Sequence, residues 1–390
     1  MNLDVNGLGT VRSLGRQGVE VHGIDWKETD VGYHSRYCRK VHVLAHPAQA
    51  PARLVEELIR LGSSYSEKPV LVPTADYYVE VISRNREALG KVFRFNIPST
   101  DLLERIVDKN HQYALAESAG VPIARTFVPT NLDELSQLKD QFRYPIFVKG
   151  QHSHLWSAQF TSKGFVARDY AELQAHVQLA LSKNVCPLLQ EIILGPNRNH
   201  FKVCAYYSAD HRLLALFGTK KLRQFPVDFG TGTCMVSERN DALAATAIRF
   251  FEKIKYTGVG SIEFKLDDRD GTYKLIELNP RLWLQNAQTS FADINFAEIY
   301  YRDLTGENPT PVLQFREGVV WVDFQKDVES FLGNRQSGDV SLFSWLKSVV
   351  RVSCFAYWAW DDWRPFAFHT RYGADLLSAP RKIVRSLFAT

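Results

Sequence analysis

The first hundred residues alternate short apolar runs with segments of helical spacing. Apolar runs predict strands at 19–24 and 70–72, and the spacing predicts helices at 10–17 and from the break at 73–76 through 86. Strands that alternate with helices favour a parallel, doubly wound sheet. The pattern therefore predicts an α/β fold at the start of the chain.

A glycine turn, Gly7-Leu8-Gly9, precedes the first of these helices. It invites comparison with dinucleotide-binding loops, but Arg12 stands where the third glycine of G-x-G-x-x-G belongs, and few residues precede the turn to form its strand. We interpret it as a strand-to-helix turn whose loop faces some other ligand.

The pattern changes after residue 98. We expect a helix at 100–119 that Gly120 ends, then a strand at 124–128, a helix near 133–141 and a strand at 146–149. Residues 188–279 are mostly strand-like and include one helix, at 241–254.

The most informative local pattern lies in residues 261–279, where two alternating runs flank Arg269-Asp270-Gly271. These three residues predict a hairpin loop with glycine in the left-handed conformation. The register counted back from this loop is Asp268 opposite Thr272, Phe264 opposite Ile276 and Ile262 opposite Leu278, with the last two pairs on one apolar face.

The other face of this hairpin pairs Glu263 directly with Glu277, and Asn279 lies one step further on. Two opposed carboxylates repel each other by about 0.2–1 kcal/mol, and a divalent cation reverses that sign. Oxygen ligands of this kind suit Mg²⁺, which takes one or two carboxylates together with phosphate and water. A solvated face on which Lys265 relieves the repulsion is the alternative.

Two lysines and one strand end suit a nucleotide. Lys149 ends the apolar run at 146–148, and Lys109 opens the helical segment after Asp108, although each lysine taken singly is more often just a solvated side chain. The apolar strand at 188–195 ends in Gln-Glu-Ile-Ile-Leu-Gly, which suits an adenine base, with a core strand meeting a turn as the alternative.

Length, charge and cysteine content limit which classes of protein this chain can belong to. The 390 residues suggest two or three packed lobes, and a net charge of +4 without a basic run argues against nucleic-acid binding. Five scattered cysteines without a CxxC pair indicate neither a zinc site nor a disulfide framework and are typical of a reducing cytosol. No secretory signal is visible, and charges interrupt the apolar stretch at 342–368, so we expect a cytoplasmic protein without a transmembrane segment.

In this order, the segments resemble the ATP-grasp superfamily, and within it the carboxylate–amine ligases of the D-aspartate ligase-like group. The resemblance covers residues 1–310 and is carried by Asp108-Lys109, Phe147-Val148-Lys149-Gly150, Gln190-Glu191-Ile192-Ile193-Leu194-Gly195, Glu263, and Glu277-Leu278-Asn279-Pro280-Arg281. Residues 6–9 with 12–15, and 221–226 with 230–232, look like motifs of that ligase group.

The resemblance implies a Rossmann-like N-terminal domain followed by a two-lobed ATP-grasp fold. The implied division is a Rossmann-like domain at 1–98, a small lobe at 99–188, a large lobe with the metal site at 189–310, and a C-terminal extension at 311–390.

It also implies roles for individual residues. Lys109 and Lys149 would contact the phosphates of ATP. The adenosine end would be held by Gln190, Glu191, Ile192, Ile193 and Asn197. One or two Mg²⁺ ions, with Mn²⁺ as the alternative, would be held by Glu263, Glu277 and Asn279. The transferred phosphoryl group would be gripped by Arg281, with added positive charge from Lys221 and Arg223.

Three departures from the family pattern stand out. Asn197 lies where relatives often carry an acid, and the strand before Gly7 is short. Residues 282–284, Leu-Trp-Leu, replace the small residues of relatives, so we expect a different substrate pocket.

The function implied is an ATP-dependent ligase that activates a carboxylate as an acylphosphate and couples it to an amine. An ATP-grasp phosphotransferase and a non-catalytic nucleotide-binding scaffold are the alternatives. The expected partners are a small carboxylate and a small amine, and a homodimer and a peripheral membrane contact stay open.

The C-terminal extension contains a segment that could contact a membrane. An apolar stripe with helical spacing runs through 342–350, and an aromatic-rich segment follows at 355–360. We expect the stripe to pack on the chain itself, with docking to a membrane or a partner as the alternative.

Overall fold

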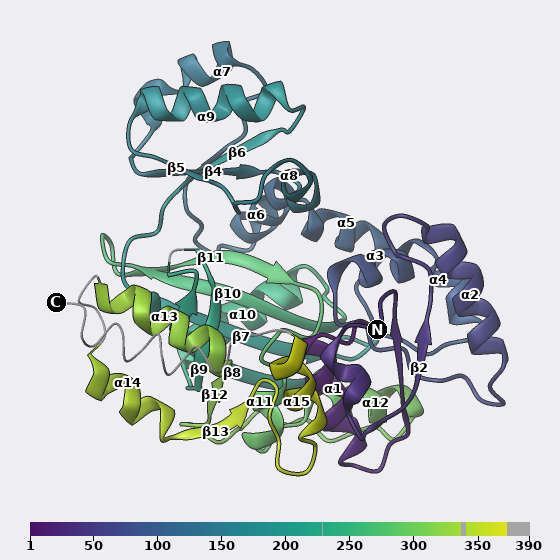
Figure 1. Cartoon of the computed structure of the whole chain (residues 1–390). Helices are drawn as coiled ribbons and strands as arrows, with labels where there is room; N and C mark the ends of the chain where they lie inside the picture. Colours follow the sequence, from purple (N-terminus) through teal and green to yellow (C-terminus); the bar gives the residue numbers. More distant parts are fainter. Residues whose placement is uncertain (228, 337–340, 373–390) are drawn as a thin grey trace.

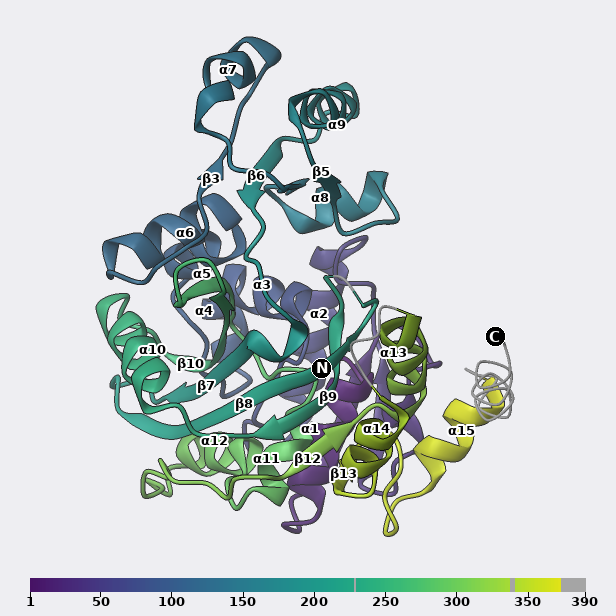
Figure 2. The same ribbon diagram turned by 90° about the vertical axis from the view of Figure 1, so that its left-hand side faces the viewer.

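The computed structural model describes residues 1–227, 229–336 and 341–372 (Figure 1). Within these residues the strands form three sheets. A two-stranded sheet pairs β1 (Val21–Asp25) with β2 (Cys38–Val43). The other two sheets have four and seven strands and lie one above the other, with the small sheet in a separate upper lobe (Figures 1 and 2).

The N-terminal region mixes helices with the short parallel sheet, as the alternating pattern predicts. Its helices are α1 (Val5–Gly15), the short 3-10 helix η1 (Val31–His34), α2 (Pro51–Ser63), α3 (Asp76–Arg84) and α4 (Arg86–Gly90). The run at 70–72 forms only an isolated parallel bridge, between Val70 and Arg94.

The glycine turn before α1 is a wrong prediction, because Gly7 and Gly9 lie inside the helix. Asp4 is the N-cap, and its carboxylate accepts from the backbone N–H of Asn6 and of Gly7. Gly7 is needed for close approach, since a Cβ there would collide with the carbonyl oxygen of Asn2.

The second region contains the four-stranded sheet, in the order β3-β6-β4-β5. Its strands are β3 (Thr126–Phe127), β4 (Ile146–Gly150), β5 (Phe165–Ala167) and β6 (Pro187–Glu191). Its helices are α5 (Thr100–Val107), α6 (Lys109–Ser118), α7 (Leu132–Gln137), the 3-10 helix η2 (Lys139–Gln141), α8 (Ser153–Gln159) and α9 (Tyr170–Ser182).

The helix predicted at 100–119 is broken at Asp108, which has an extended backbone and caps α6. The Asp108 carboxylate accepts from the N–H of His111 at 3.1 Å. The break places Lys109 on the first turn of a new helix.

The seven-stranded sheet has the order β11-β10-β7-β8-β9-β12-β13. Its strands are β7 (His200–Tyr207), β8 (Leu213–Phe225), β9 (Thr231–Ser237), β10 (Gly258–Asp267), β11 (Thr272–Asn279), β12 (Val320–Val322) and β13 (Val352–Phe355). The associated helices are η3 (Asn197–Asn199), α10 (Asp241–Lys253), α11 (Ala287–Phe291), α12 (Phe296–Thr305), α13 (Phe324–Gln336), α14 (Leu342–Val349) and α15 (Arg364–Tyr372). Phe250 and Phe251 of α10 pack on Ile262 and Phe264 in the largest apolar cluster.

The β10–β11 hairpin confirms the predicted pairing of Glu263 with Glu277, but not the whole register. A bulge after Glu263 leaves Ile276 as an extra residue, so Phe264 pairs with Leu275. The connection is one residue longer than predicted, with Asp267 opposite Thr272 in place of Asp268.

The longer connection is stabilised within the hairpin itself. The N–H of Gly271, at φ +67° as predicted, donates to the carbonyl of Asp267 at 2.8 Å. The Asp267 carboxylate also accepts from Arg269 and Lys274. The extra residue is then absorbed at the bulge.

The extension beyond residue 310 adds β12 and β13 to the large sheet. In α14, Trp345 is buried and stacks on Phe331 of α13, with ring centroids 5.0 Å apart. The expected stripe is therefore only partly buried, because Leu346 and Val350 are exposed. No helix in the described ranges is long and apolar enough to cross a membrane.

Buried ion pairs tie the extension to the N-terminal helix. Arg12 Nε lies 2.9 Å from Asp362 Oδ2, and both side chains are almost fully buried. The same carboxylate accepts from the Ser35 hydroxyl at 2.7 Å and from the Arg36 N–H at 2.9 Å. Arg16 and Asp361 form a second pair beside them at 2.8 Å.

We expect Asp362→Ala to lower the free energy of unfolding by about 3–5 kcal/mol, because it leaves the Arg12 guanidinium buried without a counter-charge. Glu307→Ala is the matched control, since its pair with Arg302 is half-exposed and is expected to contribute at most about 1 kcal/mol. Urea denaturation followed by circular dichroism measures both, and equal losses would contradict this role for the buried pair.

Candidate active site

A cavity of about 580 Å³ lies between the small sheet and the large one. It is lined by Lys149 of β4, Gln190 and Glu191 of β6, Lys221 of β8, Glu263 of β10 and Glu277 of β11, together with Lys109 at the start of α6. Strands from both sheets thus present their polar side chains to one space.

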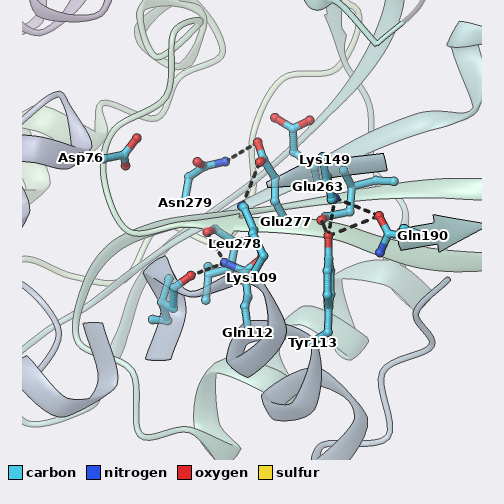
Figure 3. Close-up of polar contacts among 12 residues, drawn as sticks. Asp76, Lys109, Gln112, Tyr113, Lys149, Gln190, Glu263, Glu277, Leu278 and Asn279 are labelled. Atoms are coloured by element: carbon cyan, nitrogen blue, oxygen red, sulfur yellow. Dashed lines mark hydrogen bonds and ion pairs between the residues drawn. The ribbon is translucent and has the colours of Figure 1, made fainter. Parts of the chain in front are cut away.

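The two lysines predicted to contact phosphate both lie in this cavity. Lys109 Nζ is 3.2 Å from Glu277 Oε2 (Figure 3). Lys149 Nζ donates to the Tyr113 hydroxyl at 3.0 Å and to Gln190 Oε1 at 2.9 Å. Tyr113 in turn donates to the carbonyl of Ile276 at 3.0 Å, so the phenol links the small lobe to the hairpin.

The opposed acids are each held by a lysine. Glu263 Oε1 lies 2.8 Å from Lys202 Nζ, and Asn279 Nδ2 donates to Glu277 Oε1 at 2.9 Å. Burial raises the pKa of Glu277, but the charge of Lys109 and the hydrogen bond from Asn279 outweigh it and hold that pKa well below its usual range. The charge of Lys202 likewise outweighs burial and lowers the pKa of Glu263. Both acids are therefore carboxylates at neutral pH.

This donor set fits a magnesium ion. Two opposed carboxylates and one amide supply oxygen ligands, and the ammonium groups at the two acids show that both attract cations. In the described part of the chain, no three His, Cys, Asp or Glu side chains group as metal ligands. Because two carboxylates and one amide supply only part of a coordination shell, an ion held here would complete it with phosphate and water.

The end of the cavity predicted for adenosine is formed by β6 and the segment that follows it. Glu191 is buried, and its Oε1 has no hydrogen-bond partner among the described residues; the guanidinium of Arg125 is 3.9 Å away. The carbonyl of Ile193 accepts from Lys265 at 2.7 Å, and the N–H of Ile192 donates to Pro145. Asn197 also lines the cavity and donates to the carbonyl of Val227 at 3.1 Å.

A second cavity, of about 180 Å³, shares Lys163, Lys221, Glu263 and Glu277 with the first. It adds Lys202, Asn279, Arg281, Trp283 and Gln285. Arg281 is oriented by Asp76 at the start of α3, through two hydrogen bonds of 2.8 and 2.9 Å. The two cavities meet at the opposed acids.

Known proteins share both sequence and architecture with this chain. Residues 227–295 match the family described as the ATP binding domain of the carbamoyl-phosphate synthase L chain. The chain is 26% identical over 291 residues to D-aspartate ligase of Enterococcus faecium. This match covers 70% of this chain and 69% of that protein.

Two solved structures are similar in fold. One is the biotin carboxylase domain dimer of 2-oxoglutarate carboxylase from Hydrogenobacter thermophilus, with MgADP, ADP and bicarbonate: its TM-score is 0.63, its identity 14%, and the match covers 82% of this chain and 72% of that one. The other is L-amino acid ligase from Bacillus licheniformis, with a TM-score of 0.59 and 14% identity over 76% of this chain and 71% of that one.

The chain is thus similar in sequence and in fold to ATP-grasp enzymes. This confirms the predicted fold class, a mixed α/β protein with the ATP-grasp architecture.

Of the residues predicted for the site, Arg223 alone lies outside both cavities. It forms a buried bidentate pair with Asp327 of α13, at 2.8 Å from each oxygen. An extra residue in β8, Leu222, interrupts the alternation between Lys221 and Arg223. Lys221 therefore faces the cavities while Arg223 turns to α13, and its expected contribution to the phosphate region is wrong.

The sequence pattern did not single out three side chains that shape this site, namely Lys202, Tyr113 and Asp76. Lys202 is the Cα partner of Glu263 across β7 and β10. Its signal is a single charged residue within the apolar strand 201–207, which belongs to no motif. Tyr113 lies one helical turn after Lys109, and Asp76 is 205 residues from Arg281, a separation that hides their contact.

We expect ATP binding to take up a proton just above pH 8. Burial lowers the pKa of Lys221 to about 8, so its amine is neutral above that pH in the free protein. Triphosphate beside it favours the ammonium and raises the pKa, so binding takes up a proton in this window. Calorimetric titration with ATP at pH 8.5–9, in buffers of different ionisation enthalpy, measures the uptake as about one proton or less.

Two variants make this assignment testable. Lys221→Arg keeps its charge, so its binding should take up no proton. Lys149→Ala should bind ATP about tenfold or more weakly, because it removes a charged hydrogen-bond donor, yet still take up the proton. Unchanged uptake in Lys221→Arg would assign the proton to another group.

Proposed function

We propose that the chain is an ATP- and Mg²⁺-dependent ligase that activates a carboxylate as an acylphosphate and joins it to an amine. The observation that carries this proposal is the meeting of the two cavities at Glu263 and Glu277. The larger cavity has room for a nucleotide, and the smaller one adjoins it where the γ-phosphate would lie.

The residues take roles that follow from their positions. Lys109 and Lys149 bind the phosphates, and Glu191, with its unpaired buried oxygen, accepts from the adenine amine. The rest of the adenosine contacts come from Gln190, Ile192, Ile193 and Asn197. Glu263, Glu277 and Asn279 hold the metal, which when bound neutralises charge on the phosphate oxygens.

The second cavity holds the reacting carboxylate. There Arg281, fixed by Asp76, and Lys221 face the transferred phosphoryl group. A carboxylate oxygen bonds to the γ-phosphorus as the bond to ADP breaks. The amine then attacks the acyl carbon, phosphate leaves, and the amine proton is lost. Positioning and charge stabilisation account for such catalysis, so no serine or cysteine nucleophile is required.

Similar proteins support this chemistry. D-aspartate ligase and L-amino acid ligase are both named as amino-acid ligases, and the biotin carboxylase domain is in complex with MgADP, ADP and bicarbonate. Trp283 and its neighbours at 282–284 line or adjoin the second cavity, so we propose that they set the substrate. All five cysteines are free, which supports a cytoplasmic location. A homodimer is supported by the dimeric biotin carboxylase domain.

Phosphate release from ATP with panels of carboxylates and amines tests the proposal. We expect release that needs one carboxylate and one amine together, with product mass equal to their sum less water. ADP formation that needs no amine would favour the phosphotransferase, and no turnover with any pair would favour the nucleotide-binding scaffold.

Glu277→Gln is expected to reduce that turnover about 100-fold or more, because it removes a metal ligand's charge without changing its volume. Glu238→Gln is the matched control, since Glu238 pairs with Lys220 outside both cavities. Thermal melting reports whether each variant is folded. Near-normal turnover in folded Glu277→Gln would contradict the metal assignment.

A further inference from the structure

Helix α14 carries apolar side chains on two faces. Its inner face packs on α13, through Leu342, Trp345 and Val349. Its outer face is formed by Phe343, Leu346 and Val350, which are spaced three and four residues apart and so lie on one side. These three are 79%, 47% and 85% exposed. The outer face is thus an apolar surface that no described part of the chain covers.

A second exposed apolar group lies in the loop between β13 and α15. Trp358, Trp360 and Trp363 are 43%, 83% and 58% exposed, more than any other tryptophan in the described residues. In both views α14 and this loop lie at the lower end of the molecule, away from the small-sheet lobe (Figures 1 and 2). We call the outer face of α14 together with residues 358–363 the aromatic edge.

The exposed charge of residues 341–370, the segment that carries the aromatic edge, has one sign. Between residues 341 and 370 the acids are Asp361 and Asp362, and both are neutralised by the ion pairs with Arg16 and Arg12. The remaining charged side chains of this segment are cations, and they are exposed: Lys347, Arg351 and Arg364. Within this segment, the exposed aromatic and aliphatic side chains are therefore accompanied by exposed charges that are all positive.

We propose that the aromatic edge docks the protein peripherally on an anionic lipid bilayer. Tryptophan favours the boundary between headgroups and acyl chains, and neighbouring lysine and arginine attract acidic headgroups. None of the apolar side chains of the edge lines a cavity described above; they project outward, which suits a deformable lipid surface. The inference is independent of the proposed ligase activity.

Sedimentation with lipid vesicles tests the docking. The full chain is mixed with vesicles of phosphatidylcholine containing phosphatidylserine, or of phosphatidylcholine alone, at low and high salt. We expect binding to the anionic vesicles at low salt that is about tenfold or more tighter than to the neutral ones and that weakens at high salt. No binding, or equal binding to both vesicles, would overturn the proposal.

Variants separate the apolar contribution from the electrostatic one. We expect the triple serine variant, Phe343→Ser/Val350→Ser/Trp360→Ser, to lose most of its binding to vesicles. We expect the double variant Lys347→Gln/Arg351→Gln to lose the preference for anionic vesicles. Leu179→Ser/Leu313→Ser removes side chains of 40% and 39% exposure elsewhere, and should bind normally. Thermal melting is expected to be unchanged, because all these side chains are exposed.

Two results would overturn the lipid assignment. Undiminished vesicle binding by the folded triple serine variant would place the contact elsewhere on the molecule. The second result has two parts: the wild-type chain is a dimer that does not bind vesicles, and the triple serine variant is a monomer. The aromatic edge would then be an interface between copies of this chain.

Discussion

Two half-buried carboxylates face each other across adjacent strands, and the active site is arranged around the need to compensate their charge. Lys202, Glu263 and Glu277 are Cα partners in one row across β7, β10 and β11. Lys202 Nζ lies 2.8 Å from Glu263 Oε1, and Lys109 Nζ, on α6, lies 3.2 Å from Glu277 Oε2. Because a cation is required at this point of the sheet, the same pair suits a divalent ion when phosphate arrives. The two cavities share these acids, so a nucleotide and an acyl substrate bound as proposed would meet where the positive charge is concentrated.

Local breaks and bulges in the secondary structure position the other side chains near the two carboxylates. The break at Asp108 starts α6 at Lys109, and Gln151, after β4, donates to the same carboxylate at 2.9 Å. The junction that positions Lys109 is thereby linked to the strand that carries Lys149. The bulge at Ile276 places this residue in the cavity lining, while its carbonyl accepts from Tyr113. These features depart from regular geometry where function needs them, as is common next to active sites.

Much of the fold and of the candidate site could be predicted from the sequence, because the spacing of apolar residues and the residues that form turns are local features of the chain. The glycine of the hairpin loop and the alternation around it indicate the Glu263–Glu277 pair, and the strands that carry Gln190 and Lys149 line the cavity proposed for the nucleotide. Bulges at Leu222 and Ile276 could not be predicted, since tertiary packing selects them, and each changes which side chains face the site. The contact between Arg12 and Asp362 spans 350 residues and has no local signal at all.

The binding of Mn²⁺ tests the central claim most directly, because Mn²⁺ shares the preference of Mg²⁺ for oxygen ligands and is visible by electron paramagnetic resonance. Titration in the presence of a non-hydrolysable ATP analogue needs no knowledge of the substrates. The account predicts that the wild-type chain binds the ion with the nucleotide, and that folded Glu263→Gln/Glu277→Gln binds it at least about tenfold more weakly. Equal affinity for Mn²⁺ in the two proteins would contradict the claim that the opposed carboxylates hold the metal.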